Sequence, residues 1–211
     1  RGGCVGGGGG LGGREGGGGG GVVVGGGEGE ALGDVCLEKA NQNPASRVLD
    51  LCSGTGCVGI TLKCERPDFD VTLAEKFDEA LTYTQKNASH NNADVKIVKA
   101  DVLKGEGADG LYDLIVSNPP YINKSDMQSL QPEVKFEPET ALDGGEDGLD
   151  FYRSIVDNYK KYLSPCGVMA FEVGINQANS VCEIMKNAGF KNVDTRADLN
   201  KIDRVVFGTA N

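Results

Sequence analysis

The sequence has no tryptophan, a single histidine and no two cysteines in Cys-x-x-Cys spacing. Its seven cysteines are an odd number at scattered positions. Because histidine and cysteine clusters are missing, a zinc site has few candidate ligands, and we expect no bound metal. A disulfide framework is equally unexpected in a chain with this much aliphatic content. Reduced thiols and a cytoplasmic location are therefore predicted.

Long apolar runs and an excess of positive charge are also missing. No stretch approaches the roughly 18 apolar residues that span a bilayer, and the start of the chain lacks the apolar segment of a signal peptide. With 21 Lys and Arg against 31 Asp and Glu, the net charge is −10. This balance argues against a broad phosphate-binding surface. We expect no membrane partner, no direct nucleic-acid binding, a protein or small-molecule substrate, and a monomer.

Glycine is concentrated at the start of the chain. Of the 33 glycines, 20 fall within the first 33 residues. Glycine offers no side chain to a core and loses the most backbone entropy on folding, so residues 1–27 cannot encode a packed domain. We interpret this segment as a flexible tail, or as a stretch in which glycine stands for residues that were not identified. Residues 28–211 have ordinary globular composition and are expected to form one domain.

Strand and helix patterns alternate through residues 28–211. Strands are predicted at 47–52, 71–75, 95–98, 112–117, 167–173, 191–195 and 203–208. Helices are predicted at 28–39, 57–64, 78–88, 149–163 and 178–188. Such alternation with short connections predicts an α/β fold with a doubly wound, mostly parallel seven-stranded sheet and an antiparallel edge strand.

The first strand leads into a glycine-rich turn. Residues 50–59 read Asp-Leu-Cys-Ser-Gly-Thr-Gly-Cys-Val-Gly, which places Gly-x-Gly-x-x-Gly between a strand and a helix. Glycines let a backbone turn tightly and approach a ligand closely. Nicotinamide- and flavin-dependent enzymes share this motif with methyltransferases, and a tight turn without a ligand also fits it. Asp50 favours a methyltransferase, because its carboxylate would repel a pyrophosphate and attract the cationic methionine end of S-adenosylmethionine.

Two acidic residues follow the next two strands. Glu75 ends the second strand, where a carboxylate can accept both ribose hydroxyls, although a solvated strand end also fits. Asp101 follows the third strand and can contact an adenine amino group, although acidic residues are common in loops. The predicted cofactor-binding residues are Asp50, Cys52, Ser53, Gly54, Thr55, Gly56, Glu75, Lys76, Asp101, Val102 and Asn118.

The fourth strand leads into Asn118-Pro119-Pro120-Tyr121. An amide or aromatic amino nitrogen is a poor nucleophile because its lone pair is delocalised, so its methylation needs acceptors for both hydrogens. The Asn118 side-chain oxygen and the Pro119 carbonyl can accept them, and consecutive prolines hold that carbonyl in place. Tyr121 offers a flat face to a planar group. A proline turn that merely closes the strand is the alternative.

These motifs resemble the amino-methyltransferases, which include DNA-adenine, RNA-guanine and protein-glutamine enzymes. Residues 137–153, Glu-Pro-Glu-Thr-Ala-Leu-Asp-Gly-Gly-Glu-Asp-Gly-Leu-Asp-Phe-Tyr-Arg, resemble more narrowly the PrmC/HemK family of peptide chain release factor glutamine methyltransferases, as do residues 171–174, Gln177 and 203–206. The resemblance implies a Rossmann-like class I methyltransferase domain over residues 28–211. It also implies S-adenosylmethionine as cofactor, S-adenosylhomocysteine as product, and N5-methylation of the glutamine in the Gly-Gly-Gln motif of class 1 release factors.

The resemblance also assigns roles to substrate-binding residues. It implies that Asn118 and Pro119 hold the glutamine amide, that Tyr121 packs beside it, and that Pro120 and Glu137 contribute to the substrate site. The family usually has Pro-Arg-Pro-Glu-Thr-Glu where residues 25–30 read Gly-Gly-Gly-Glu-Gly-Glu. It also carries an N-terminal helical domain that helps to dock the release factor, which residues 1–27 are not expected to form.

Three other functions compete with this one. An amino-methyltransferase acting on adenine or guanine in nucleic acid shares the tetrapeptide, but it fits the acidic charge and residues 137–148 less well. A non-catalytic cofactor-binding domain is the second alternative. A nicotinamide-dependent reductase would explain the glycine turn and leave Asn-Pro-Pro-Tyr without a role.

Overall fold

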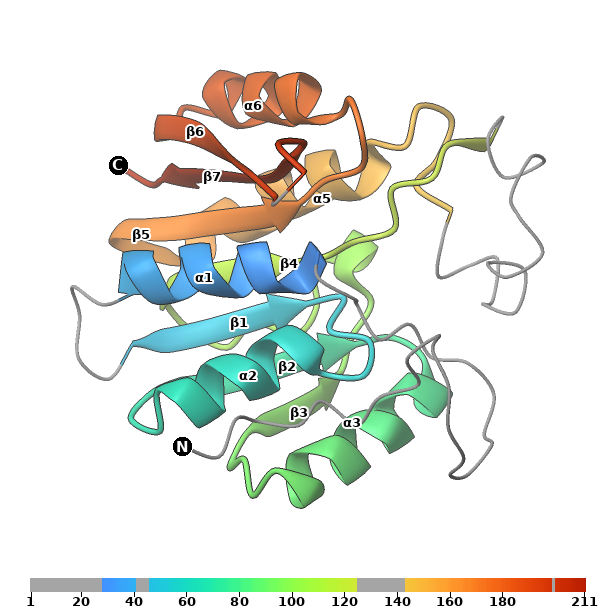
Figure 1. Cartoon of the computed structure of the whole chain (residues 1–211), viewed down its shortest axis with the longest axis vertical. Helices are drawn as coiled ribbons and strands as arrows, with labels where there is room; N and C mark the ends of the chain where they lie inside the picture. Colours follow the sequence, from blue (N-terminus) through green and yellow to red (C-terminus); the bar gives the residue numbers. More distant parts are fainter. Residues whose placement is uncertain (1–27, 41–45, 125–142, 199) are drawn as a thin grey trace.

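A computed structural model of the chain describes residues 28–40, 46–124, 143–198 and 200–211. Figure 1 shows the arrangement of its elements. The strands are β1 (Arg47–Leu51), β2 (Asp70–Glu75), β3 (Lys96–Lys99), β4 (Tyr112–Ser117), β5 (Leu163–Glu172), β6 (Lys191–Ala197) and β7 (Asp203–Thr209). The helices are α1 (Glu28–Ala40), α2 (Cys57–Glu65), α3 (Asp78–His90), α5 (Asp150–Tyr159) and α6 (Ala178–Asn187), with 3-10 turns η1 (Val102–Lys104) and η4 (Lys160–Tyr162).

The seven described strands form one sheet in the order β3-β2-β1-β4-β5-β7-β6. Neighbours from β3 to β5 pair in parallel, whereas β7 pairs antiparallel with both β5 and β6. The antiparallel pair β6–β7 therefore completes one edge of the sheet. The predicted fold class, a doubly wound and mostly parallel α/β sheet with an antiparallel edge, is confirmed.

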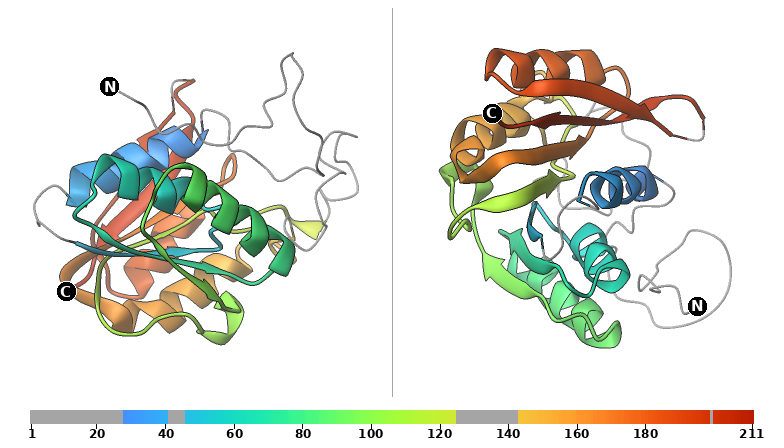
Figure 2. Two further views of the ribbon diagram at one scale, coloured as in Figure 1. Left: turned by 90° about the horizontal axis from the view of Figure 1, so that it is seen from below. Right: turned by 90° about the vertical axis from the view of Figure 1, so that its left-hand side faces the viewer.

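Helices cover both faces of this sheet, as Figure 2 shows. One core lies beneath α1, α2 and α3 and includes Leu32, Ile60 and Leu62. The second lies beneath α5 and α6 and includes Tyr152 and Val181. Because β1 and β4 are covered on both sides, nearly all of their residues are buried.

The largest difference from the predicted boundaries lies between α5 and β5. A helix is predicted over 149–163 and a strand from 167, but α5 ends at Tyr159 and β5 already begins at Leu163. Tyr112 pairs with Leu163, and the register then shifts before Leu114 pairs with Val168. Cys166 has a positive φ of 63° within this irregularity. Residues 164–167 therefore bulge opposite the single residue Asp113, and regular pairing with β4 resumes at Val168.

The parallel order brings four connections to one edge of the sheet. The segments that follow β1, β2, β3 and β4 all leave from the carboxyl ends of adjacent strands, and ligands of α/β sheets bind at this edge. The glycine turn, Glu75, Asp101 and the Asn-Pro-Pro-Tyr segment are the predicted residues on these connections. Among the described helices, none has both the length and the apolar character required to cross a membrane.

Candidate active site

The turn between β1 and α2 uses two glycines in different ways. Gly54 and Gly56 have φ angles of 55° and 81°, a region that side chains other than glycine adopt at a cost. A Cβ on Gly56 would lie 2.8 Å from Ile60 Cδ1, so this glycine is required for close packing of α2. A Cβ on Gly54 would meet no atom of the described residues within 4 Å. Gly54 therefore borders open space at the carboxyl edge of the sheet.

Asp50 lies beneath this turn and is only 2% exposed. Its Oδ2 atom accepts a hydrogen bond of 2.9 Å from the Gly59 amide, which ties β1 to the first turn of α2. Burial raises the pKa of Asp50 to about 7, the Gly59 hydrogen bond opposes this shift, and the charge of Glu75 adds to it. The contacts of Asp50 thus support the turn from within, and its predicted contact with a cationic ligand stays a prediction.

The titration of Asp50 gives the protein a pH-dependent stability. Because its pKa in the folded state is higher than its ordinary value of 3.8, folding favours the protonated form, and the stability that Asp50 contributes is lost as pH rises from about 4 to about 7. We expect Asp50→Asn, which keeps an acceptor for Gly59, to remove this loss. Urea unfolding of the wild type and the variant at a series of pH values measures it. If the free energy of unfolding changed with pH in the same way for both proteins, Asp50 would not be the group whose titration lowers the stability.

Glu75 organises the same turn from β2. Its Oε2 atom accepts a hydrogen bond from the Gly54 amide at 2.9 Å, and Oε1 accepts from the Lys76 and Phe77 amides at 2.8 Å each. The side chain is 5% exposed, so the alternative of a freely solvated strand end is not what the structure shows. A carboxylate held by three amides keeps a fixed orientation and retains lone pairs for further donors.

The loops that follow β2 and β3 are joined by an ion pair. Lys76 Nζ lies 3.2 Å from Asp101 Oδ2, and Asp101 Oδ1 caps η1 by accepting from the Leu103 amide at 3.2 Å. Burial alone would raise the pKa of Asp101, but Lys76 and the Leu103 amide together lower the pKa below its ordinary value. Val102 is buried in the core next to this loop. Asp101 and Lys76 are thus brought together, whereas the side chain of Val102 belongs to the core.

Two apolar residues at this edge were missed by sequence reasoning. Phe77 and Leu103 are 37% and 45% exposed, although large hydrophobic side chains usually avoid water. Phe77 directly follows Lys76, and Leu103 directly follows Asp101 and Val102. Apolar side chains on two adjacent loops can pack against the faces of a planar ring. Their order after two acidic residues at strand ends is the sequence signal that could have revealed them.

The tetrapeptide after β4 is held at its first residues by the sheet. Ser117 Oγ donates a hydrogen bond of 2.7 Å to the Leu51 carbonyl, which joins the ends of β4 and β1. Pro119 is buried, and Asn118 and Tyr121 are partly exposed. The Asn118 side chain makes no hydrogen bond to another described residue, so its oxygen can accept a hydrogen from a ligand.

Beyond Tyr121 the chain runs beside residues 143–145. Ile122 forms a parallel bridge with Asp143, and Lys124 donates a backbone hydrogen bond of 3.2 Å to the Gly145 carbonyl. The predicted substrate residue Glu137 and the glycine tract of residues 1–27 lie outside the described residues. The roles of all these residues in binding and catalysis stay predictions.

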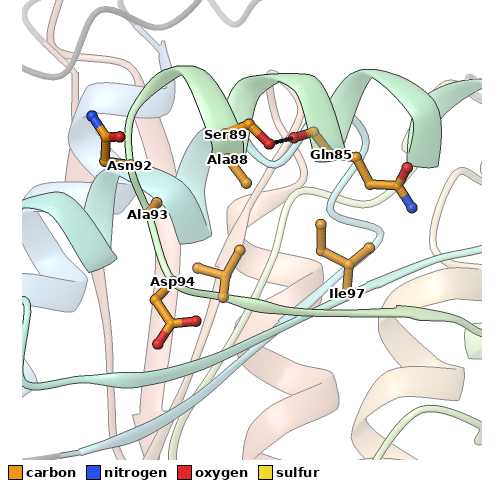
Figure 3. Close-up of a pocket in the computed structure, with 8 residues that line it drawn as sticks. Gln85, Ala88, Ser89, Asn92, Ala93, Asp94 and Ile97 are labelled. Carbon is orange, nitrogen blue, oxygen red and sulfur yellow. Dashed lines mark hydrogen bonds between the residues drawn. The ribbon is translucent and has the colours of Figure 1, made fainter.

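A pocket of about 490 Å³ lies elsewhere, between α3 and β3. Figure 3 shows its lining, which includes Gln85, Ser89, Asn92 and Ile97. These residues belong to the second half of α3, the turn after it and the start of β3, away from the carboxyl edge that carries the predicted site. No group of three or more potential metal ligands occurs within the described ranges.

Known proteins resemble this chain in sequence and in fold. The methyltransferase small domain family matches residues 32–135. The release factor glutamine methyltransferase of Geobacter sulfurreducens is 42% identical over 178 residues, covering 83% of this chain and 62% of that protein. The release factor glutamine methyltransferase of Clostridium acetobutylicum is 38% identical over 182 residues, covering 84% of this chain and 64% of that protein. The chain therefore spans less than two thirds of the length of these relatives.

A solved structure shares the fold. The methyltransferase from Pyrococcus furiosus aligns with a TM-score of 0.63 at 17% identity, covering 85% of this chain and 83% of that one. At this level of identity the similarity concerns the architecture alone.

Proposed function

Because the chain belongs to the family of the release factor glutamine methyltransferases, we propose that it transfers a methyl group from S-adenosylmethionine to the side-chain amide nitrogen (N5) of a glutamine in a protein substrate. The observation that carries the proposal is the position of Asn118-Pro119-Pro120-Tyr121 directly after β4, next to the glycine turn that follows β1. The two strands are adjacent and parallel, so the segments that follow their carboxyl ends lie side by side, which supports the proposed roles of the tetrapeptide in amide binding and of the glycine turn in cofactor binding.

The protein residues act mainly by alignment. When bound, S-adenosylmethionine would supply an electrophilic methyl group and would be converted to S-adenosylhomocysteine. Asn118 Oδ1 and the Pro119 carbonyl accept the two amide hydrogens of the glutamine, which turns the nitrogen lone pair toward the methyl carbon. The nitrogen–carbon bond forms as the sulfur–carbon bond breaks, and the nitrogen releases one proton to water. Tyr121 packs against the flat amide group.

The residues present fit S-adenosylmethionine. Ser53 Oγ is buried and has no hydrogen-bond partner among the described residues, and a buried hydroxyl of this kind calls for a polar partner. Gly54 borders open space, and next to Gly54 the carboxylate of Glu75 is oriented by hydrogen bonds from three backbone amides. In this assignment Ser53 and Gly54 contact the methionine end of the cofactor, and Glu75 accepts the ribose hydroxyls. Phe77 covers one face of the adenine ring.

The affinity for the cofactor tests the role of Glu75. Hydrogen bonds to a charged group contribute about 1.5–3 kcal/mol, so we expect Glu75→Gln to weaken S-adenosylmethionine binding by roughly 10- to 100-fold. The new side-chain NH2 group would also face backbone N–H groups that now donate hydrogen bonds to the carboxylate. Isothermal titration calorimetry measures the change, and Glu79→Gln on the exposed first turn of α3 serves as the matched control. Equal affinity in both variants would remove Glu75 from the ribose site.

We further propose the Gly-Gly-Gln glutamine of a class 1 peptide chain release factor as the substrate, which places the reaction in the cytoplasm. The proposal rests on the named relatives and on the acidic net charge, which disfavours a nucleic-acid substrate. The test supplies tritiated S-adenosylmethionine together with release factor, DNA or RNA, followed by mass spectrometry of the Gly-Gly-Gln peptide. We expect a gain of one methyl group on that glutamine. Label that enters only nucleic acid would overturn the proposal.

A further inference from the structure

The side chain of Gln177 joins three segments that are distant in the sequence. Gln177 lies immediately before α6, and its Oε1 atom accepts a hydrogen bond of 3.0 Å from the Gly174 amide. Its Nε2 atom donates to the Tyr121 carbonyl at 2.9 Å and to the Gly148 carbonyl at 3.3 Å. The oxygen and both hydrogens of this amide are thus engaged, so its orientation is determined.

The contacts around Gln177 leave little free space. A Cβ on Gly148 would lie 2.5 Å from the Tyr121 carbonyl oxygen and 2.6 Å from Gln177 Nε2. A Cβ on Gly174 would lie 2.8 Å from Gln177 Oε1 and 2.9 Å from Tyr121 Cδ2. Both glycines therefore allow a close approach that any larger residue would prevent. Gly148 also has a φ of 75°, which favours glycine for a second reason.

The position of Tyr121 bears directly on the tetrapeptide. Ser117 anchors the chain to β1 just before Asn118, and Gln177 holds the carbonyl of Tyr121, the last residue of the tetrapeptide. Between these two anchors, Pro119 and Pro120 have fixed φ angles, so few backbone torsions remain free. A segment held at both ends and stiffened in between keeps its acceptor oxygens in one arrangement, as alignment catalysis requires.

We propose that Gln177 is a positioning residue for methyl transfer, which fixes the Asn118–Tyr121 segment through the Tyr121 carbonyl without touching the substrate. The inference rests on the proposed function of that segment and adds the device that orients it. Gln177 acts on the acceptors for the glutamine amide, whereas the glycine turn and Glu75 belong to a different part of the site.

Two substitutions separate positioning from general stability. Gln177→Glu keeps the shape and the acceptor for Gly174 but turns a carboxylate toward two carbonyl oxygens, whereas Gln177→Ala removes all three hydrogen bonds. For both variants we expect kcat at pH 8 to fall at least about tenfold, while the Kd for S-adenosylmethionine changes less than about twofold. Gln85→Glu on the exposed face of α3 is the matched control and is expected to behave as the wild type.

The pH dependence supplies a readout that a purely structural role would not give. A protonated carboxyl at position 177 can donate one hydrogen to the Tyr121 carbonyl, so the activity of Gln177→Glu relative to the wild type should recover as pH falls from 8 toward 6. Gln177→Ala has no group to protonate and should show no recovery. An activity ratio that stays constant with pH for Gln177→Glu would overturn the positioning role.

Hydrogen exchange tests the anchoring without relying on activity. In Gln177→Ala we expect faster amide exchange in the peptide that contains residues 121–124, and unchanged exchange in residues 52–60. If the wild type fails to methylate release factor but this local change occurs, the anchor stands and the proposed function fails. If the wild type is active and the variants match it in kcat and in exchange, the inference fails and the proposed function stands.

Discussion

Asn118→Ala is expected to reduce kcat for methyl transfer by roughly 10²- to 10³-fold, the range observed when one oriented polar group is removed from an active site. The substitution removes the side-chain oxygen that accepts one hydrogen of the substrate amide. The partner Pro119 carbonyl remains, but one acceptor alone does not determine the direction of the nitrogen lone pair. Since the residues around the glycine turn are unchanged, the Kd for S-adenosylmethionine should change little.

Tritium transfer to release factor under single-turnover conditions measures the effect of Asn118→Ala, because it isolates methyl transfer from product release. Asn179→Ala is the matched control, since this asparagine is exposed on α6. We expect its activity to equal that of the wild type. Full activity in Asn118→Ala would mean that the Asn118 side chain does not hold the amide, and the mechanism would need another acceptor.

Gly56→Val is expected to cause the largest loss of stability. The new side chain would have a φ of 81° and a Cβ 2.8 Å from Ile60 Cδ1 and 2.9 Å from Thr84 Cγ2. Overpacking and backbone strain of this kind together cost about 2–5 kcal/mol, which is a large share of the stability of a domain. We expect a clear fall in the urea midpoint, with cofactor binding lost as a consequence of unfolding.

Gly54→Ala should separate binding from stability in the same turn. Its Cβ would meet open space, so the cost to folding is limited to the left-handed backbone, about 1–2 kcal/mol. The methyl group would nevertheless stand where the backbone approaches the cofactor, and we expect the Kd to rise about tenfold or more. Gly33→Ala in α1, also next to open space, is the control and should slightly stabilise the helix. Calorimetry measures the loss of cofactor affinity, and urea unfolding measures the loss of stability. Equal Kd values for Gly54→Ala and the wild type would mean that the cofactor does not bind next to Gly54.

Much of the candidate site could be predicted because its signals are local. The glycine turn occurs where strand and helix patterns meet, and Glu75 and Asp101 stand at or just after the ends of strands. What such patterns do not contain is the state of each side chain. The sequence suggested a cationic ligand for Asp50, which stays a prediction, and did not indicate that its carboxylate accepts a hydrogen bond from Gly59 inside the turn. For Glu75, the sequence left open a side chain that is simply solvated at the end of its strand. In the structure three backbone amides donate hydrogen bonds to its carboxylate.

The sequence by itself determined the alternation of strands and helices, the glycines at positive φ and the stiffness of Asn-Pro-Pro-Tyr, because each depends on residues adjacent in the chain. Only the tertiary structure decided which distant groups meet. Gln177 bonds to Tyr121, 56 residues away, and to Gly148, 29 residues away. Nothing in the spacing of these residues predicts the contact, because it exists only once β4 and β5 pair in the sheet and bring their carboxyl ends together.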